Sequence, residues 1–207
     1  KKKSVNMKRT IKTKDSALVV TDMLYDFIDG TLACAGANEA VAALKEYIEA
    51  IAAESENDED AILGGYPVLF ICDHHPANHS SFKEFGGIWP THCVAGTRGG
   101  EVHKAIECYR DDVFTFYKGC DASKEQYSGF EGVNEAGQSL EEVLSLLEIK
   151  TVYVTGIATE YCVKNTAEDI KKAGYNVVVL KDCLGYVDAK GHEDTLKEFT
   201  SKGIEVI

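Results

Sequence analysis

Residues 151–174 read Thr-Val-Tyr-Val-Thr-Gly-Ile-Ala-Thr-Glu-Tyr-Cys-Val-Lys-Asn-Thr-Ala-Glu-Asp-Ile-Lys-Lys-Ala-Gly. The apolar run 151–156 predicts a buried strand, and 161–173 predicts a helix that Gly174 terminates. The short connection between them places Cys162 at the start of that helix. A helix start presents unpaired N–H groups and a partial positive charge, which favour a thiolate and can bind an oxyanion. The alternative is an ordinary buried cysteine, the usual fate of a free thiol.

The same alternation of apolar runs and amphipathic stretches continues on both sides of this segment. Apolar runs predict five further strands, at 17–22, 68–73, 113–118, 176–181 and 204–207. Three further helices are predicted, at 38–53, 139–147 and 192–200. Ser139 and Glu142, at the start of the second, have the spacing of a capping box. Strands this apolar, alternating with helices, are typical of a parallel α/β sheet covered on both faces.

The composition is that of one globular domain preceded by a short basic segment. We expect a lead-in at 1–16 and a single domain at 17–207. The net charge of −12 repels phosphate backbones and anionic lipid, so we expect no nucleic-acid or membrane partner. The seven cysteines are odd in number and include no CxxC pair, which argues against a disulfide framework and for a reducing cytoplasm. The acidic run from Glu54 to Asp60 is interpreted as a solvated loop.

Reactive side chains follow several of the predicted strands. Asp22, Asp73 and Lys118 each end a strand, and the turn leading to Cys162 follows another. Ligands of such sheets bind beyond the carboxyl ends of the strands, so we expect these residues at one edge. Asp22, Lys118 and Cys162 would then supply a carboxylate base, a cation and a nucleophile, as amide cleavage through a thioester requires. Alternatively, Asp22 and Lys118 are strand-end charges in water.

Histidines gather after the strand that ends at Asp73. The sequence continues His74-His75-Pro-Ala-Asn-His79, and Trp89-Pro-Thr-His92-Cys93 follows. A carboxylate and an imidazole two residues apart project the same way from a strand end, and a distant histidine can complete a three-ligand metal site with open positions. The alternative is a group of surface histidines with an aspartate cap.

These segments resemble the isochorismatase-like cysteine hydrolases and, within them, the nicotinamidases. The matching strings occur in the family order and cover the chain from about Ala17 to its end. They are Val-Thr-Asp22-Met-Leu-Tyr-Asp26-Phe27, Asp73-His-His75-Pro-Ala-Asn-His79-Ser-Ser-Phe82, Trp89-Pro-Thr-His92-Cys93, Lys118-Gly, Tyr127-Ser-Gly-Phe130 and Gly156-Ile-Ala-Thr-Glu-Tyr-Cys162-Val-Lys-Asn-Thr166.

The resemblance implies a three-layer α/β/α sandwich, Rossmann-like, with a six-stranded, mainly parallel sheet. It implies a catalytic triad of Asp22, Lys118 and Cys162 that hydrolyses nicotinamide to nicotinate and ammonia. It also implies one divalent metal ion on Asp73, His75 and His92, with zinc as the first choice and iron or manganese as alternatives. Candidates for a fourth metal ligand are His79 and Glu84.

Further expectations from the resemblance concern the pocket. A cis peptide at Ile157-Ala158 would aim the N–H groups of Ala158 and Cys162 into an oxyanion hole. Four aromatic side chains are candidates to contact the flat substrate ring: Phe27, Trp89, Tyr161 and Tyr127. Core packing is the alternative for Phe27 and Tyr127.

The chain departs from the family pattern at two positions. His74 stands where tryptophan is common, which could alter pocket polarity or add a competing ligand. Glu160, two residues before Cys162, replaces a frequent aspartate, so the charge is kept while its reach changes.

Three other functions compete with that of a nicotinamidase. A related amidohydrolase acting on an N-carbamoyl or ureido substrate would keep the cysteine triad but generally lacks the full set of metal residues, and isochorismatase itself would not need the metal. A catalytically silent binding protein on the same fold should have lost a triad member. Pyrazinamide is a second candidate substrate, and a homo-oligomer is left open.

Overall fold

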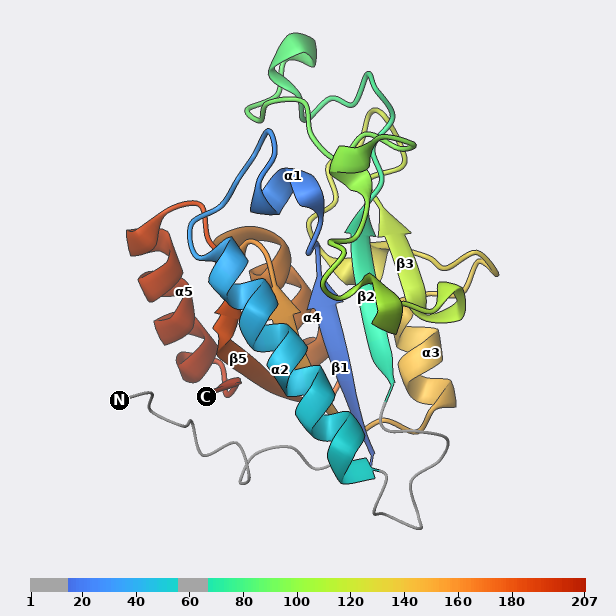
Figure 1. Cartoon of the computed structure of the whole chain (residues 1–207), viewed down its shortest axis with the longest axis vertical. Coiled ribbons are helices and arrows are strands. Elements are labelled where there is room, and N and C mark those ends of the chain that lie inside the picture. Colours follow the sequence, from blue (N-terminus) through green and yellow to red (C-terminus); the bar gives the residue numbers. More distant parts are fainter. Residues whose placement is uncertain (1–14, 56–66) are drawn as a thin grey trace.

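Six strands form a single parallel sheet in the order β3-β2-β1-β4-β5-β6 (Figure 1). The computed structural model describes residues 15–55 and 67–207. The strands are β1 (Ser16–Thr21), β2 (Val68–Asp73), β3 (Thr115–Lys118), β4 (Thr151–Gly156), β5 (Asn176–Leu184) and β6 (Glu205–Val206). The predicted six-stranded parallel sheet is therefore confirmed. The basic lead-in up to residue 14 and most of the acidic run lie outside the described residues.

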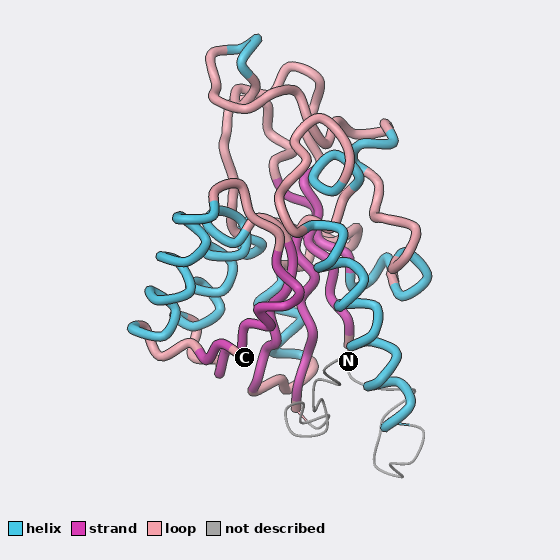
Figure 2. The backbone as a smooth tube through the Cα atoms, turned by 60° about the vertical axis from the view of Figure 1, so that its left-hand side comes forward, coloured by secondary structure: helices cyan, strands magenta, loops and turns pink. Residues whose placement is uncertain are grey.

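Helices cover both faces of the sheet. The side chains of each strand alternate between the two faces, and both faces are apolar, so each one packs against its own layer of helices. On β1, Leu18 and Val20 face the core beneath helices α1 and α2, whereas Ala17 and Val19 face the core beneath α3, α4 and α5. The helices are α1 (Tyr25–Ile28), α2 (Ala37–Ser55), α3 (Leu140–Leu146), α4 (Lys164–Lys172) and α5 (Ala189–Ser201). Figure 2 shows the strands between these two helical layers, which confirms the predicted α/β/α sandwich.

Local signals account for the helix ends. The Ser139 hydroxyl accepts the Glu142 backbone N–H at 3.2 Å, and the Glu142 carboxylate accepts the Ser139 N–H at 2.7 Å, so the predicted capping box is present. Asp188 caps α5 by accepting the Gly191 N–H at 2.7 Å. After α4 the chain turns at Gly174, as predicted.

The segment before α4 differs from the prediction. Cys162 lies in a π-helical turn, Thr159–Val163, that precedes α4, and not in the first turn of an α-helix. The wider turn is closed by a hydrogen bond from Val163 N–H to Ala158 carbonyl, 3.1 Å across five residues. Such turns often occur at functional sites. Apolar periodicity does not distinguish this turn from the helix that follows.

The connections that follow β1 and β2 begin beyond the carboxyl ends of these strands, in the upper part of Figure 1. They contain the short 3₁₀ helices η2 (Lys83–Phe85), η3 (Arg98–Gly100), η4 (Glu107–Tyr109) and η5 (Asp112–Phe114), and η6 (Gly129–Glu131) follows β3. Because η5 takes up the first residues of the apolar run at 113–118, β3 is shorter than predicted. Parallel bridges join His75 to Val94 and Phe82 to Trp89, so this long segment folds back on itself over the sheet edge.

All seven cysteines lie in the described part of the chain and are free thiols. Within residues 15–55 and 67–207, no helix combines the length and apolar character needed to cross a bilayer.

Candidate active site

The carboxyl ends of strands β1, β3 and β4 lie at one edge of the sheet and bring Asp22, Lys118 and the turn that carries Cys162 together. The register pairs Asp73 at the end of β2 with Lys118 at the end of β3, and the Asp22 N–H donates to the Ile71 carbonyl at 2.8 Å. Asp22 adopts a left-handed backbone, with φ of 47°. The neighbouring strand end must be glycine, because a Cβ on Gly156, at φ of 123°, would lie 2.0 Å from the Thr21 carbonyl oxygen.

The ammonium of Lys118 is the centre of this group. Its Nζ lies 3.0 Å from Asp22 Oδ2 and 3.4 Å from Cys162 Sγ, and it makes a shorter contact with Asp73 Oδ1. Asp22 and Lys118 are at most 1% exposed and Cys162 is 6% exposed. Water therefore screens these charges little, and each depends on its protein partners. The structure places all three predicted catalytic residues within contact of one another.

Burial shifts the pKa values of both Asp22 and Cys162. It raises the pKa of Asp22 to about 6, helped by the negative charge of Asp73 and opposed by Lys118 and a hydrogen bond with Cys162. Burial also raises the pKa of the Cys162 thiol well above its usual value, although Lys118 opposes the shift. Two opposed effects therefore act on Cys162: burial disfavours the thiolate, whereas the Lys118 ammonium favours it.

Asp73, His75 and His92 form a buried set with suitable ligand atoms, all within 4.8 Å of one another. The Nε2 atoms of His75 and His92 lie 3.4 and 3.8 Å from Asp73 Oδ2. Each Nδ1 faces a backbone carbonyl, Gly119 O at 2.9 Å and Pro90 O at 2.7 Å, so each Nδ1 donates its N–H there and Nε2 is the ring nitrogen left to face a metal ion. One carboxylate and two oriented imidazoles fit a zinc, iron or manganese ion with open positions.

Gly119 gives His75 its place. A Cβ on this residue would lie 2.4 Å from His75 Cε1, and its φ of 67° also disfavours a side chain. The glycine that follows Lys118 therefore makes room for the His75 ring.

The structure does not bring the candidate fourth ligands into this set. His79 is buried next to His75, but its Nδ1 lies 2.7 Å from Ser81 Oγ and its Nε2 lies 3.0 Å from Lys124 O. Glu84 is exposed on η2. His74 is half-buried and packs against the Tyr117 ring at 5.0 Å, away from the set.

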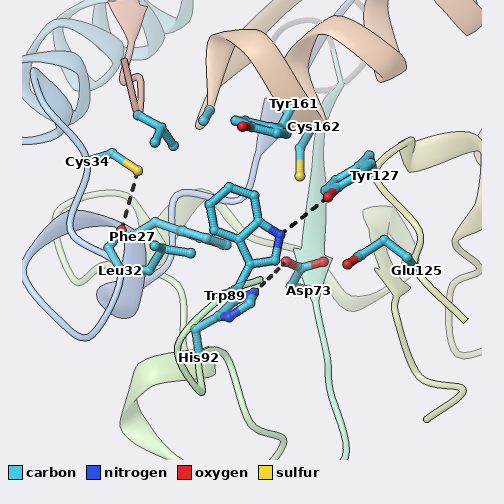
Figure 3. Close-up of a pocket in the computed structure, with 12 residues that line it drawn as sticks. Phe27, Leu32, Cys34, Asp73, Trp89, His92, Glu125, Tyr127, Tyr161 and Cys162 are labelled. Carbon is cyan, nitrogen blue, oxygen red and sulfur yellow. Dashed lines mark hydrogen bonds and ion pairs between the residues drawn. The ribbon is translucent and has the colours of Figure 1, made fainter. Parts of the chain in front are cut away.

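One pocket is lined both by Cys162 and by two residues of the candidate metal set, Asp73 and His92 (Figure 3). Its lining includes Cys162, Ala158, Asp73 and His92, together with all four predicted aromatic residues, Phe27, Trp89, Tyr127 and Tyr161. Trp89 Nε1 donates to the Tyr127 hydroxyl at 3.3 Å, and the Trp89 and Tyr161 rings meet edge to face at 4.9 Å. The Ile157-Ala158 peptide is cis, as the resemblance implies. The arrangement suits a flat ring carrying one reactive group.

An Isochorismatase domain model matches residues 16–207. The chain belongs to the isochorismatase family.

Relatives in this family match the chain over nearly its whole length. The nicotinamidase/pyrazinamidase of Mycobacterium tuberculosis is 34% identical over 195 residues, covering 92% of this chain and 97% of the relative. The pyrazinamidase of Pyrococcus horikoshii, solved in complex with zinc, is 34% identical with a TM-score of 0.79, covering 93% and 98%. PnC1 from L. infantum, solved in complex with nicotinate, is 30% identical with a TM-score of 0.76, covering 96% and 94%.

Sequence reasoning missed several residues that shape the site of this isochorismatase-family chain. Leu32, Cys34, Glu125 and Val187 line the pocket but lie in connections without hydrophobic periodicity. Asp26 belongs to the motif that contains Asp22, yet nothing in the motif indicates its role. Its carboxylate accepts N–H groups from Cys93 at 2.8 Å and Thr31 at 3.2 Å, so it ties two loops together beside His92. Its place four residues after Asp22 is the one sequence signal that points to it.

Proposed function

We propose that this chain hydrolyses nicotinamide to nicotinate and ammonia through a thioester on Cys162. One observation carries the proposal: Cys162 and the metal residues Asp73 and His92 open into the same aromatic-walled pocket. A nucleophile alone would suit many small amides. A metal set beside it suits an amide whose ring carries a donor atom, as the ring nitrogen of nicotinamide does.

Asp22 acts as the proton acceptor in the first step. Its carboxylate takes the proton from the Cys162 thiol, and the sulfur attacks the carboxamide carbon to form a tetrahedral intermediate. Lys118, 3.0 Å from Asp22 and 3.4 Å from Cys162, stabilises the negative charge as it moves from one partner to the other. The buried position makes this stabilisation larger than it would be in water.

The intermediate then releases ammonia. Asp22 returns the proton to the departing nitrogen as the carbon–nitrogen bond breaks, which leaves an acyl thioester on Cys162. Water attacks the thioester carbon, Asp22 accepts its proton, and the sulfur leaves with that proton as a thiol. The product leaves as nicotinic acid and loses the second water proton to solvent to become nicotinate, and the thiol–carboxylate pair is restored.

Backbone N–H groups of Ala158 and Cys162 would hold the oxyanion of the intermediate, since both residues line the pocket next to the sulfur. Phe27, Trp89 and Tyr161 would contact the faces and edges of the ring, with Tyr127 supporting Trp89 through its hydroxyl. These contacts would bring the carboxamide to the thiol.

Asp73, His75 and His92 would hold one divalent metal ion. The zinc complex of the Pyrococcus horikoshii pyrazinamidase supports zinc as the first choice, with iron and manganese as alternatives. When bound, such an ion supplies a Lewis acid that the ring nitrogen can meet directly or through water.

Pyrazinamide is the second substrate that we propose, because it is also a flat ring with a carboxamide and a ring nitrogen, and the Mycobacterium tuberculosis relative is named for both activities. The free cysteines support a cytoplasmic location. A homo-oligomer is compatible with this site, and size measurement in solution would decide it.

The direct test is ammonia release by the purified protein from nicotinamide, pyrazinamide, an N-carbamoyl amino acid and buffer alone. We expect release from the first two, a loss after metal chelation, and recovery when zinc is restored. Release from the ureido substrate alone would reject the proposal in favour of the related amidohydrolase. Full activity after verified metal removal would reject the metal assignment.

A further inference from the structure

The pocket has two chemically different sides. Leu32 and Cys34 lie on one side of Trp89, and Glu125 and Tyr127 lie on the other (Figure 3). Leu32 and Cys34 belong to the connection between α1 and α2. Val187 also lines the pocket, from the connection between β5 and α5, and is 42% exposed.

The two connections that carry the apolar residues are joined to each other. Ala35 and Tyr186 exchange backbone hydrogen bonds of 2.9 and 3.0 Å in a short antiparallel bridge. This bridge lies one residue away from both Cys34 and Val187. A movement of either connection therefore moves the other.

Glu160 ties this pair of loops to the nucleophile. Its carboxylate accepts the backbone N–H of Val187 at 2.8 Å on Oε1 and that of Asp188 at 3.2 Å on Oε2. Thr159 N–H donates to the Gly185 carbonyl at 2.9 Å. Thr159 and Glu160, consecutive residues of the π-helical turn, therefore bind both ends of the loop 185–188 between β5 and α5. The turn that carries Cys162 thus also positions Val187.

We propose that Glu160 is a positioning residue that sets the width of the pocket mouth through Val187 and thereby restricts the site to small, unsubstituted aromatic carboxamides. A carboxylate suits this role because each oxygen accepts one of two adjacent N–H groups. In a glutamine, one of these two oxygens is replaced by an NH2 group, a donor that would face a backbone N–H, so only one of the two hydrogen bonds is kept in the same geometry. The shorter aspartate side chain would have to draw the loop closer to the nucleophile turn.

The alternative is that Glu160 orients Cys162, which follows it by two residues. The two roles differ in what they change. A residue that sets the mouth changes the discrimination between small and large molecules. A residue that orients the nucleophile changes the reaction of all molecules equally.

The test compares Glu160→Ala, Glu160→Gln and Val187→Ala with the unaltered chain. Glu193→Ala is the matched control, because it removes the same charge from a position on α5 outside these loops. Cys162 is alkylated with iodoacetamide and with the bulkier N-phenylmaleimide, and the rate at the Cys162 peptide is followed by mass spectrometry. The ratio of the two rates cancels changes in intrinsic thiol reactivity.

We expect the bulky-to-small ratio to rise about tenfold in Glu160→Ala and Val187→Ala, the discrimination typical of one or two methylene groups in a pocket. Glu160→Gln should show a smaller rise, and Glu193→Ala none. An unchanged ratio in Glu160→Ala, with both rates lowered alike, would overturn the proposal. If Glu160→Ala fails to fold, Glu160→Gln and Val187→Ala decide the question by the same ratio.

Steady-state kinetics provide the second measurement, and they rest on the proposed function. For nicotinamide, Glu160→Ala should raise KM with kcat nearly kept, and kcat/KM for a ring-methylated nicotinamide should rise relative to that for nicotinamide. A fall in kcat with an unchanged ratio would contradict the mouth role. If the unaltered chain releases no ammonia from nicotinamide, the proposed function fails, and the alkylation ratio still decides the role of Glu160.

Discussion

The reactive centre and the mouth of its pocket are built in opposite ways. The centre consists of charged and polar side chains that are almost fully buried at the ends of hydrogen-bonded strands, where the parallel register fixes Asp73 opposite Lys118. The mouth consists of apolar side chains on two loops, held by the Ala35–Tyr186 bridge and by Glu160. Changes at the centre should therefore remove the chemistry or the fold, whereas changes at the mouth should alter selection.

The largest effect should follow from removing the nucleophile. We expect Cys162→Ala to lower ammonia release from nicotinamide by at least about 10⁴-fold, the usual scale for loss of a covalent nucleophile. Bound zinc should be retained, because Cys162 lies outside the Asp73, His75 and His92 set. Metal analysis and an ammonia assay on the same preparation check both parts. Substantial remaining activity would remove Cys162 from the mechanism.

The second largest effect concerns the cation at the centre. Lys118→Ala leaves Asp22 and Asp73 buried with no ammonium between them. We expect the free energy of unfolding to fall by about 3–5 kcal/mol, the cost of breaking a buried ion pair by removing one partner. Urea denaturation measures it. Lys150→Ala, which removes an exposed pair with Asp15, is the control and should change stability by less than about 1 kcal/mol. Equal effects in the two variants would contradict the described burial.

The third prediction distinguishes the proposed metal ligand His92 from the neighbouring histidine His79. His92→Ala should lower zinc affinity by about 100-fold or more and lower activity with it, whereas His79→Gln should change zinc affinity far less. The reason is that both ring nitrogens of His79 already face protein atoms. Competition with a chromophoric chelator gives both affinities. A loss in His79→Gln as large as in His92→Ala would make His79 the fourth ligand.

The smallest expected effect concerns Asp26, whose carboxylate holds the loop at Thr31 and the loop at Cys93, next to His92. Asp26→Asn keeps one of two hydrogen bonds to the loops at Thr31 and Cys93, so zinc affinity should fall by about tenfold. Exposed Asp29 is the matched control, and Asp29→Asn should leave zinc affinity unchanged. The same chelator competition applies. Equal affinities in the two variants would show that Asp26 does not position His92.

The difference between the two regions also explains what could be predicted from the sequence. Buried strands are recognisable by their apolar runs, and parallel strands end at one edge, so the strand pattern alone places Asp22, Asp73 and Lys118 together. Cys162 is singled out by its place at a predicted helix start and the histidines by their place after a strand end, the family motifs add their roles, and the structure brings these predicted residues together.

Other properties depend on tertiary contacts that no local pattern encodes. The π-helical turn has the same apolar spacing as the helix after it, and the raised pKa of Cys162 reflects burial by distant segments. Cys34 and Val187 meet at the pocket through a bridge between loops about 150 residues apart in sequence, a pairing without periodicity. The exclusion of His79 from the metal set depends on where Lys124 places its carbonyl.

The bridge between Ala35 and Tyr186 has a consequence for how substitutions at the pocket act in this chain. It confines the apolar rim of the pocket to two surface loops that share no register with the strands bearing the acid, the lysine and the metal residues. We therefore expect substitutions of Leu32, Cys34 or Val187 to alter which molecules enter the pocket and to leave the buried side chains in place. In this chain the side chains that meet an incoming molecule and the side chains that face the reacting atoms therefore belong to separate structural units.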